Sequence, residues 1–140
     1  MPAFDYATVR AVRVPTGDAV TVGAVLSCRQ ARFLDVVLTD GAGAAERLGL
    51  DAGLLARGLD AFRSVAAGGP GGGPVGRLPA SERFHFLTAT RSASLQTSAV
   101  RTGTTDDPAA ALREIARSLG LDRAPGPAGL GAEAGGPGRP

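Results

Sequence analysis

The stretch AVTVGAVLSCR, residues 19–29, decides the fold class, because apolar side chains alternate along it with small or polar ones. Alternation with a period of two is typical of a β-strand that buries one of its faces. The side chains expected on the buried face are Val20, Val22, Ala24, Leu26 and Cys28. We therefore predict a half-buried strand here.

Two further strands are expected beside this one. Residues 32–39 repeat the alternation with Leu34, Val36 and Leu38 inward, and the short RQAR link suits an antiparallel hairpin. A first strand, over about residues 5–14, is joined to the second through a Pro-Thr-Gly-Asp segment, which favours another hairpin. The three strands are predicted to form an antiparallel meander.

The hydrophobic pattern changes after Asp51 to the period of about 3.6 residues that marks an amphipathic helix. The apolar stripe of this helix consists of Leu55, Leu59, Phe62 and Ala66. Asp51 is the expected N-cap, and Gly68 and Gly69 are expected to end the helix.

Three shorter helices are expected along the rest of the chain. One begins after the turn at Gly41, which follows the third strand. Another begins at Pro79 and runs to about Leu87. An Asp-Pro pair at Asp107 caps the last helix, which stops at Gly120.

Residues 93–102, ASLQTSAVRT, are predicted to form a fourth strand that is unusually polar. Its hydrogen-bonding side chains fall on both faces, and buried polar groups must be paired. This pattern suits either an edge strand with a wet outer face or the wall of a binding site. The predicted fold class is α+β, with an antiparallel sheet of three meander strands plus a later fourth strand, packed with about four helices.

A single domain is expected over residues 1–121, because 140 residues suffice for one hydrophobic core and not for two. Within it, the Gly/Pro-rich segment 68–77 is predicted to be a flexible surface loop with too few side chains to pack. Residues 122–140 are almost all Gly, Pro and Ala, and we predict a disordered tail there.

The composition excludes several chemistries. All fifteen basic residues are Arg, so a phosphate-binding P-loop, which requires Lys, is excluded. One cysteine and one histidine cannot build an internal disulfide or a zinc site, and we expect neither a metal nor a cofactor. No apolar run has the length of a membrane span and no signal peptide is expected, which favours a cytoplasmic protein.

Nucleic acid is not an expected partner, because the net charge is only +2 and an Arg-only basic set is equally typical of a GC-rich bacterial genome. If the chain did bind nucleic acid, the contact would be made by arginines of the meander, namely Arg10, Arg13, Arg29 and Arg32.

His85 is the only histidine and the candidate catalytic residue, as a general acid or base. Its position between Phe84 and Phe86 on a short helix is also typical of a structural, partly buried histidine. The candidate ligand-binding side chains, which would meet His85 around an anionic or polar ligand, are Arg83, Arg91, Gln96, Thr97 and Arg101.

Five blocks of sequence, FDYATVRAVR, VTVGAVLSCR, RFLDVVL, SERFHFLTATRS and LQTSAVRTG, resemble in this order the bacterial family called Domain of Unknown Function 3037. The resemblance covers roughly residues 4–119, and its most specific blocks are SERFHFL and LQTSAVRTG. It implies no activity. It does imply a protein partner, a HipA-like kinase, because members of the family look often to be encoded beside one.

Two functions follow as hypotheses. The leading hypothesis is a non-catalytic accessory or interaction protein, because metal, nucleotide and catalytic-triad motifs are missing. The alternative is a small enzyme that acts on a phosphate-bearing or nucleotide substrate, with His85 as general acid or base and arginines as anion clamps.

Removal of residues 122–140 should leave the domain folded, because a segment of Gly, Pro and Ala buries too little apolar surface to contribute to a core. We expect the thermal midpoint of the shortened chain, followed by circular dichroism, to lie within about 2 °C of that of the full chain. A drop of about 10 °C or more would place the domain boundary further along the sequence.

Overall fold

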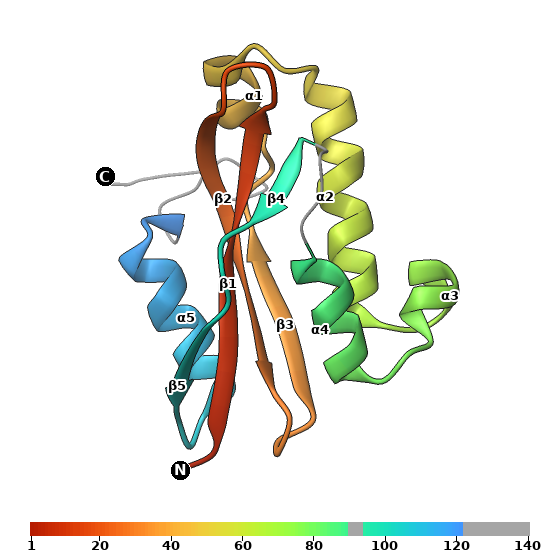
Figure 1. The fold of residues 1–140 in the computed structure, drawn as a ribbon, viewed down its shortest axis with the longest axis vertical. Coiled ribbons are helices and arrows are strands. Elements are labelled where there is room, and N and C mark those ends of the chain that lie inside the picture. Colours follow the sequence, from red (N-terminus) through yellow and green to blue (C-terminus); the bar gives the residue numbers. More distant parts are fainter. Residues whose placement is uncertain (90–93, 122–140) are drawn as a thin grey trace.

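The structure, a computed structural model, describes residues 1–89 and 94–121. Its strands are β1 (Ala3–Arg13), β2 (Asp18–Cys28), β3 (Phe33–Leu38), β4 (Leu95–Thr97) and β5 (Arg101–Thr104). They form one antiparallel sheet in the order β3-β2-β1-β4, and β5 pairs with the first residues of β1 (Figure 1). The predicted three-strand meander is confirmed.

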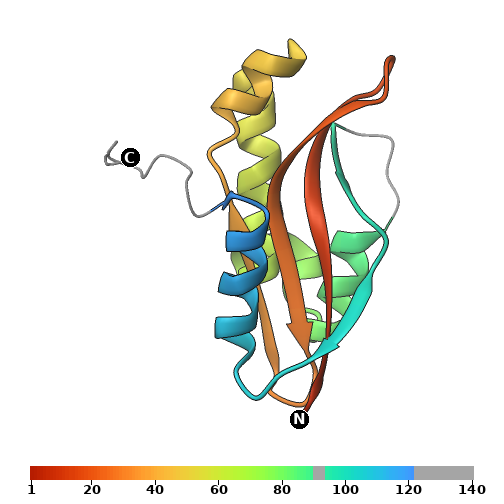
Figure 2. The same ribbon diagram turned by 90° about the vertical axis from the view of Figure 1, so that its left-hand side faces the viewer.

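Helices cover both faces of this sheet. They are α1 (Ala42–Leu48), α2 (Ala52–Ala67), α3 (Gly73–Gly76), α4 (Ala80–Thr88) and α5 (Pro108–Ser118), with a 3-10 turn at Pro70–Gly72. Figure 1 shows the sheet between α5 on its left and α2 and α4 on its right. Figure 2, seen from the side of α5, shows this helix running along the strands of the sheet. The predicted α+β class is confirmed, and no helix in the described ranges is long and apolar enough to span a membrane.

A β-bulge in β2 changes which of its side chains face each of the two layers of helices. Val9 of β1 pairs with Gly23. The next residue, Arg10, pairs with Thr21, so Val22 is the extra residue of the bulge. The side chains that pack under α1, α2 and α4 are Val20, Val22 and Val25, and those that pack under α5 are Ala24, Leu26 and Cys28. The prediction of a single buried face is therefore wrong, and β2 is buried on both faces.

The polar segment after α4 forms two short edge strands, where the sequence predicts one strand over residues 93–102. Its first residue lies outside the described residues, and Ser98 interrupts the strand. The Thr8 N–H donates to the Ser98 hydroxyl oxygen at 2.9 Å, and the Ser98 N–H donates to the Thr8 carbonyl at 2.9 Å. A side-chain oxygen thus replaces a carbonyl of the ladder, which breaks the strand while leaving these polar groups paired.

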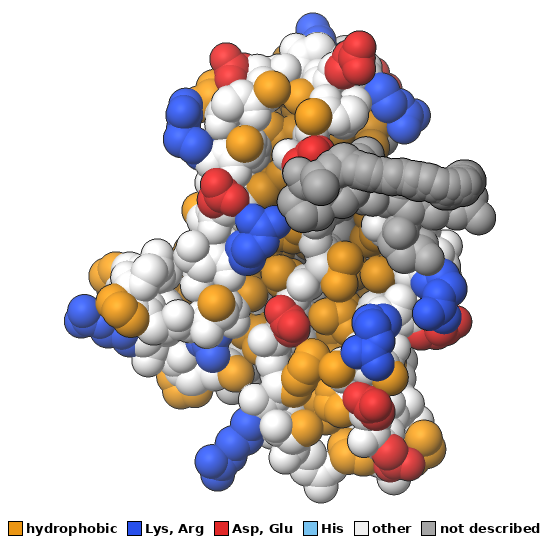
Figure 3. All heavy atoms as spheres, turned by 180° about the vertical axis from the view of Figure 1, so that it is seen from behind, with side chains coloured by type: hydrophobic (Ala, Val, Ile, Leu, Met, Phe, Trp, Pro, Cys, Tyr) orange, Lys and Arg blue, Asp and Glu red, His pale blue; other side chains and the backbone are white. Residues whose placement is uncertain are grey.

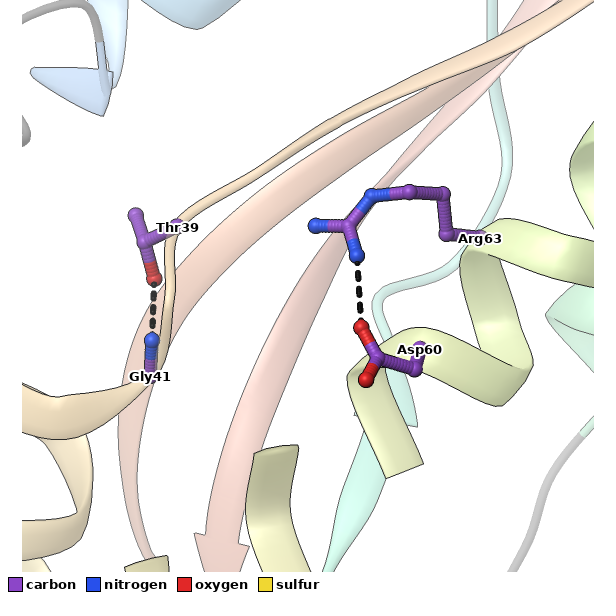
Figure 4. Close-up of polar contacts among 4 residues, drawn as sticks. All are labelled: Thr39, Gly41, Asp60 and Arg63. Carbon is purple, nitrogen blue, oxygen red and sulfur yellow. Dashed lines mark hydrogen bonds and ion pairs between the residues drawn. The ribbon is translucent and has the colours of Figure 1, made fainter. Parts of the chain in front are cut away.

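The helix starts confirm the predicted caps. Asp51 and Asp107 each accept, through Oδ1, a hydrogen bond from the N–H three residues later, at 2.9 Å and 3.1 Å. α1 begins after Gly41, whose φ of 83° is a left-handed conformation that favours glycine. The Gly41 N–H donates to the Thr39 hydroxyl at 3.2 Å, which holds the turn into α1 (Figure 4).

The Gly/Pro-rich segment forms two helical turns beside α2. The Gly69 N–H donates to the Gly76 carbonyl at 2.7 Å and joins the two ends of the segment. Val75 thereby packs against the core under α1, α2 and α4. The prediction that residues 68–77 have no packing side chain is wrong at Val75, because this closure brings it back to the core, whereas the flexibility of the segment stays a prediction.

Gly23→Ala should destabilise the domain, because its Cβ would lie 2.4 Å from both the Val37 carbonyl oxygen and Leu38 Cδ2. We expect the free energy of unfolding, measured by urea denaturation, to fall by about 2–3 kcal/mol. Gly43→Ala in α1 meets no atom within 4 Å and is the matched control. It should raise the stability by about 0.5–1 kcal/mol. Wild-type stability in the Gly23→Ala chain would contradict this close approach of β2 and β3.

Candidate functional site

An apolar groove lies between α2, α4 and β4, and its volume is about 270 Å³. Apolar side chains form most of its lining, namely Ala61, Phe62, Val65, Phe86, Leu87 and Leu95. Phe86, which belongs to this lining, has 39% of its surface exposed. The groove is therefore a hydrophobic surface open to a ligand.

Small residues of α2 shape this groove. Gly58 and Ala61 are three positions apart and therefore lie on the same side of the helix. A Cβ on Gly58 would lie 3.2 Å from Leu95 Cδ1, so α2 and β4 come close together there. Charged side chains of α2 lie outside the groove lining, and two of them, Asp60 and Arg63, form an exposed ion pair at 2.9 Å (Figure 4).

Gln96 and Thr97, two of the predicted ligand-binding residues, line the groove as its polar members. The Thr97 hydroxyl donates to the Thr88 carbonyl at 3.3 Å and so connects β4 to the end of α4. Gln96 pairs with Arg10 in the sheet. These two residues thus lie at the groove because β4 extends the sheet beside α4.

Arg83 acts as a structural link between helices. Its Nη1 donates to the carbonyl oxygens of Val65 and Ala66, at 3.0 Å and 2.6 Å, and its Nε donates to the Leu78 carbonyl at 3.0 Å. The last carbonyls of a helix have no partner within the helix. The Arg83 guanidinium satisfies the Ala66 carbonyl and gives a second donor to the Val65 carbonyl, which also accepts from the Gly68 N–H at 3.2 Å. It thereby fastens α4 to the end of α2.

His85 lies on the exposed side of α4. Its ring centroid is 6.5 Å from that of Phe84, in an edge-on arrangement. Within the described part of the chain, no hydrogen bond or ion pair orients the imidazole toward an acid, a base or a nucleophile. The expectation of a partly buried histidine is wrong, because the buried stripe of α4 consists of Phe84 and Leu87.

Arg101 lies in a different place from the groove. It is exposed on β5 and lines a hollow with Tyr6, Ser98 and Ile115, on the side of the sheet that α5 covers. Arg91 lies outside the described residues. Of the predicted set, the structure thus brings together Gln96 and Thr97, while Arg101 faces another hollow.

Charge is mixed on the surface opposite to the view of Figure 1. Figure 3 shows acidic and basic side chains interspersed there among apolar ones. Such a mixture creates no strong field of one sign over that face.

Arg10, one of the arginines of the meander, has its Nε sealed from solvent and without a partner among the described residues.

The sequence reasoning missed the apolar members of the groove. Phe62 belongs to the predicted inward stripe of α2, and Phe86 stands in SERFHFL, one of the two blocks most specific to the family resemblance. The sequence does show that Phe86 is an apolar residue next to the buried positions of α4. It does not show that α2 packs beside α4, and this packing is what forms the groove.

Comparison with known proteins gives a family and no function. Residues 6–119 match the family model described as "Protein of unknown function (DUF3037)", which confirms the resemblance seen in the sequence. No curated protein and no solved structure matches the chain. The matched range contains every residue of the apolar groove.

Arg83→Gln should destabilise the domain, because two carbonyl groups at the end of α2 lose their charged donor. We expect the free energy of unfolding to fall by about 1.5–3 kcal/mol. His85→Gln on the same helix is the control and should change it by about 0.5 kcal/mol or less, because the side chain is exposed. Equal stability of the two variants in urea denaturation would contradict the structural role of Arg83.

Proposed function

The chain belongs to the family of proteins of unknown function DUF3037, and from this premise we propose that it is a non-catalytic accessory protein that binds another protein through the apolar groove. The observation that carries the proposal is the groove itself, which combines an apolar lining with the exposed ring of Phe86. Exposed apolar surface of this kind is typical of interaction sites.

The groove suits an apolar anchor from a partner. A few buried anchor side chains supply most of the binding free energy of a protein interface, and they insert into pockets that exclude water. A volume of about 270 Å³ between α2 and α4 offers such a pocket. The polar Gln96 and Thr97 would give direction to the contact.

A HipA-like kinase is the partner that we propose, because the family resemblance suggests that such a kinase is encoded nearby. An accessory protein needs no catalytic groups of its own. It acts by occupying or stabilising a surface of its partner, and an open apolar groove supports that kind of contact.

The competing function is an enzyme acting on a phosphate-bearing or nucleotide substrate with His85 as acid or base. Its anion clamp requires Arg83, Arg91 and Arg101 to meet His85, and Arg91 lies outside the described residues. In the described part of the chain, Arg83 bonds the end of α2 and Arg101 lines the hollow near α5. These placements favour the interaction proposal.

Ala61→Glu should weaken the complex, because it places a charge in the lining of the groove. We expect the dissociation constant for the neighbouring HipA-like kinase, co-expressed and then measured by calorimetry, to rise at least about tenfold, which is about 1.4 kcal/mol. Ala56→Glu is the matched control, since Ala56 is an exposed residue of the same helix outside the groove lining, and it should bind like wild type.

The two parts of the proposal fail in different ways. If the wild-type chain does not bind the kinase, the partner is wrong. If Ala61→Glu binds as tightly as Ala56→Glu while both chains melt like wild type, the groove is not the contact surface.

A further inference from the structure

A second hollow lies at the opposite end of α4 from the apolar groove. The turn between β2 and β3 and the first turn of α4 meet there, at the lower end of the view in Figure 1. The volume of this hollow is about 410 Å³. We call it the basic hollow, and its lining includes Ser27, Arg29, Arg32, Pro79, Ser81 and Arg83.

Ser27 is the unusual member of this set. Only 5% of its surface is exposed, and it is the one buried polar side chain among the residues that the structure describes. No described residue hydrogen-bonds to its hydroxyl, and the oxygen is not sealed off, so it opens into the hollow. Because the hydroxyl is accessible from the hollow, it can exchange a hydrogen bond with a ligand that enters there.

Two arginines flank the turn that borders Ser27. The Arg32 N–H donates to the Arg29 carbonyl at 3.0 Å, which closes the turn. Arg32 has a φ of 52°, a left-handed conformation that a residue with a side chain seldom adopts. In the described part of the chain, neither arginine forms an ion pair, since the ion pairs there join Asp60 to Arg63 and Glu114 to Arg117.

The start of α4 supplies backbone donors to the same hollow. Pro79 provides no side-chain cap, and the N–H groups of Glu82 and Arg83 both donate to its carbonyl at 3.0 Å. The N–H groups of Ala80 and Ser81 precede them in the first turn, where a helix has no acceptors of its own. The helix dipole also favours an anion at this end.

Two further charged residues of α4, Arg83 and Glu82, lie at or near the hollow. Arg83 lines the hollow, and its Nη1 and Nε donate hydrogen bonds to carbonyl oxygens. These bonds fix the position of its positively charged guanidinium. Glu82, the acidic residue in the first turn of α4, is exposed and is not part of the lining. The charged side chains that line the hollow are therefore all arginines.

From these observations we propose that the basic hollow binds a phosphate group. Two hydroxyl groups, two backbone N–H groups and the guanidinium groups of Arg29 and Arg32 exceed what the two oxygens of a carboxylate accept. They match the several oxygens and the double negative charge of phosphate. The site uses residues outside the apolar groove, so it goes beyond the proposed interaction function and stands without it.

Calorimetric titration of the full chain with inorganic phosphate, at constant ionic strength, tests this proposal. We expect saturable binding that the double variant Arg29→Gln/Arg32→Gln weakens at least about tenfold. Ser27→Ala should weaken it about threefold to tenfold, because the variant loses one donor. Arg113→Gln, which changes an exposed arginine of α5 outside the lining, is the matched control and should bind like wild type.

A parallel titration with glycerol 3-phosphate separates a free phosphate ion from a phosphate ester. Binding of either compound supports the site, and the tighter of the two identifies its source. Absence of saturable binding of both, or equal binding by wild type and the double arginine variant, would overturn the proposal. Acetate that binds as tightly as phosphate would also overturn it. Because both arginines are exposed, the variant should melt like wild type.

Discussion

Burial of β2 on both faces is the constraint on which the rest of the structure depends. A strand in this position must present apolar side chains to two cores, and each fully buried Leu or Val contributes about 1.5–3 kcal/mol. The bulge at Val22 shifts the alternation of the strand, so that Val22 and Val25 both face the core under α1, α2 and α4 while Leu26 faces α5. Gly23 has no side chain, which lets β3 approach the bulge closely. Both layers of helices follow from this division.

α4 is the element through which this arrangement reaches the surface. Its buried residues Phe84 and Leu87 pack on the core that β2 shares with α2. Arg83 fastens it to the last carbonyls of α2, and Thr97 connects its end to β4. A helix held at so many points presents fixed surfaces at both ends, the basic hollow at Ser81 and the apolar groove beyond it.

The candidate site shows why residue type alone does not assign a role. A guanidinium donates to carbonyl oxygens as well as to anionic ligands, so the sequence block around Arg83 is compatible with both an anion clamp and a helix cap. The fold decides for the cap, because the open end of α2 lies within reach. The polar residues of the edge segment also take different roles. Ser98 accepts a hydrogen bond from the Thr8 N–H in the sheet, whereas Thr97 lines the groove.

The sequence by itself determined the features that depend on residues a few positions apart. The strands of the meander, the cap at Asp51 and the helix after Asp107 follow from local periodicity and from side chains that bond their own backbone. Only the tertiary structure decided that β2 has a bulge at Val22 and that Ser27 lies beside the start of α4 in the basic hollow. The physical reason is that these features arise between segments distant in sequence, and no local pattern records which segment will supply the partner.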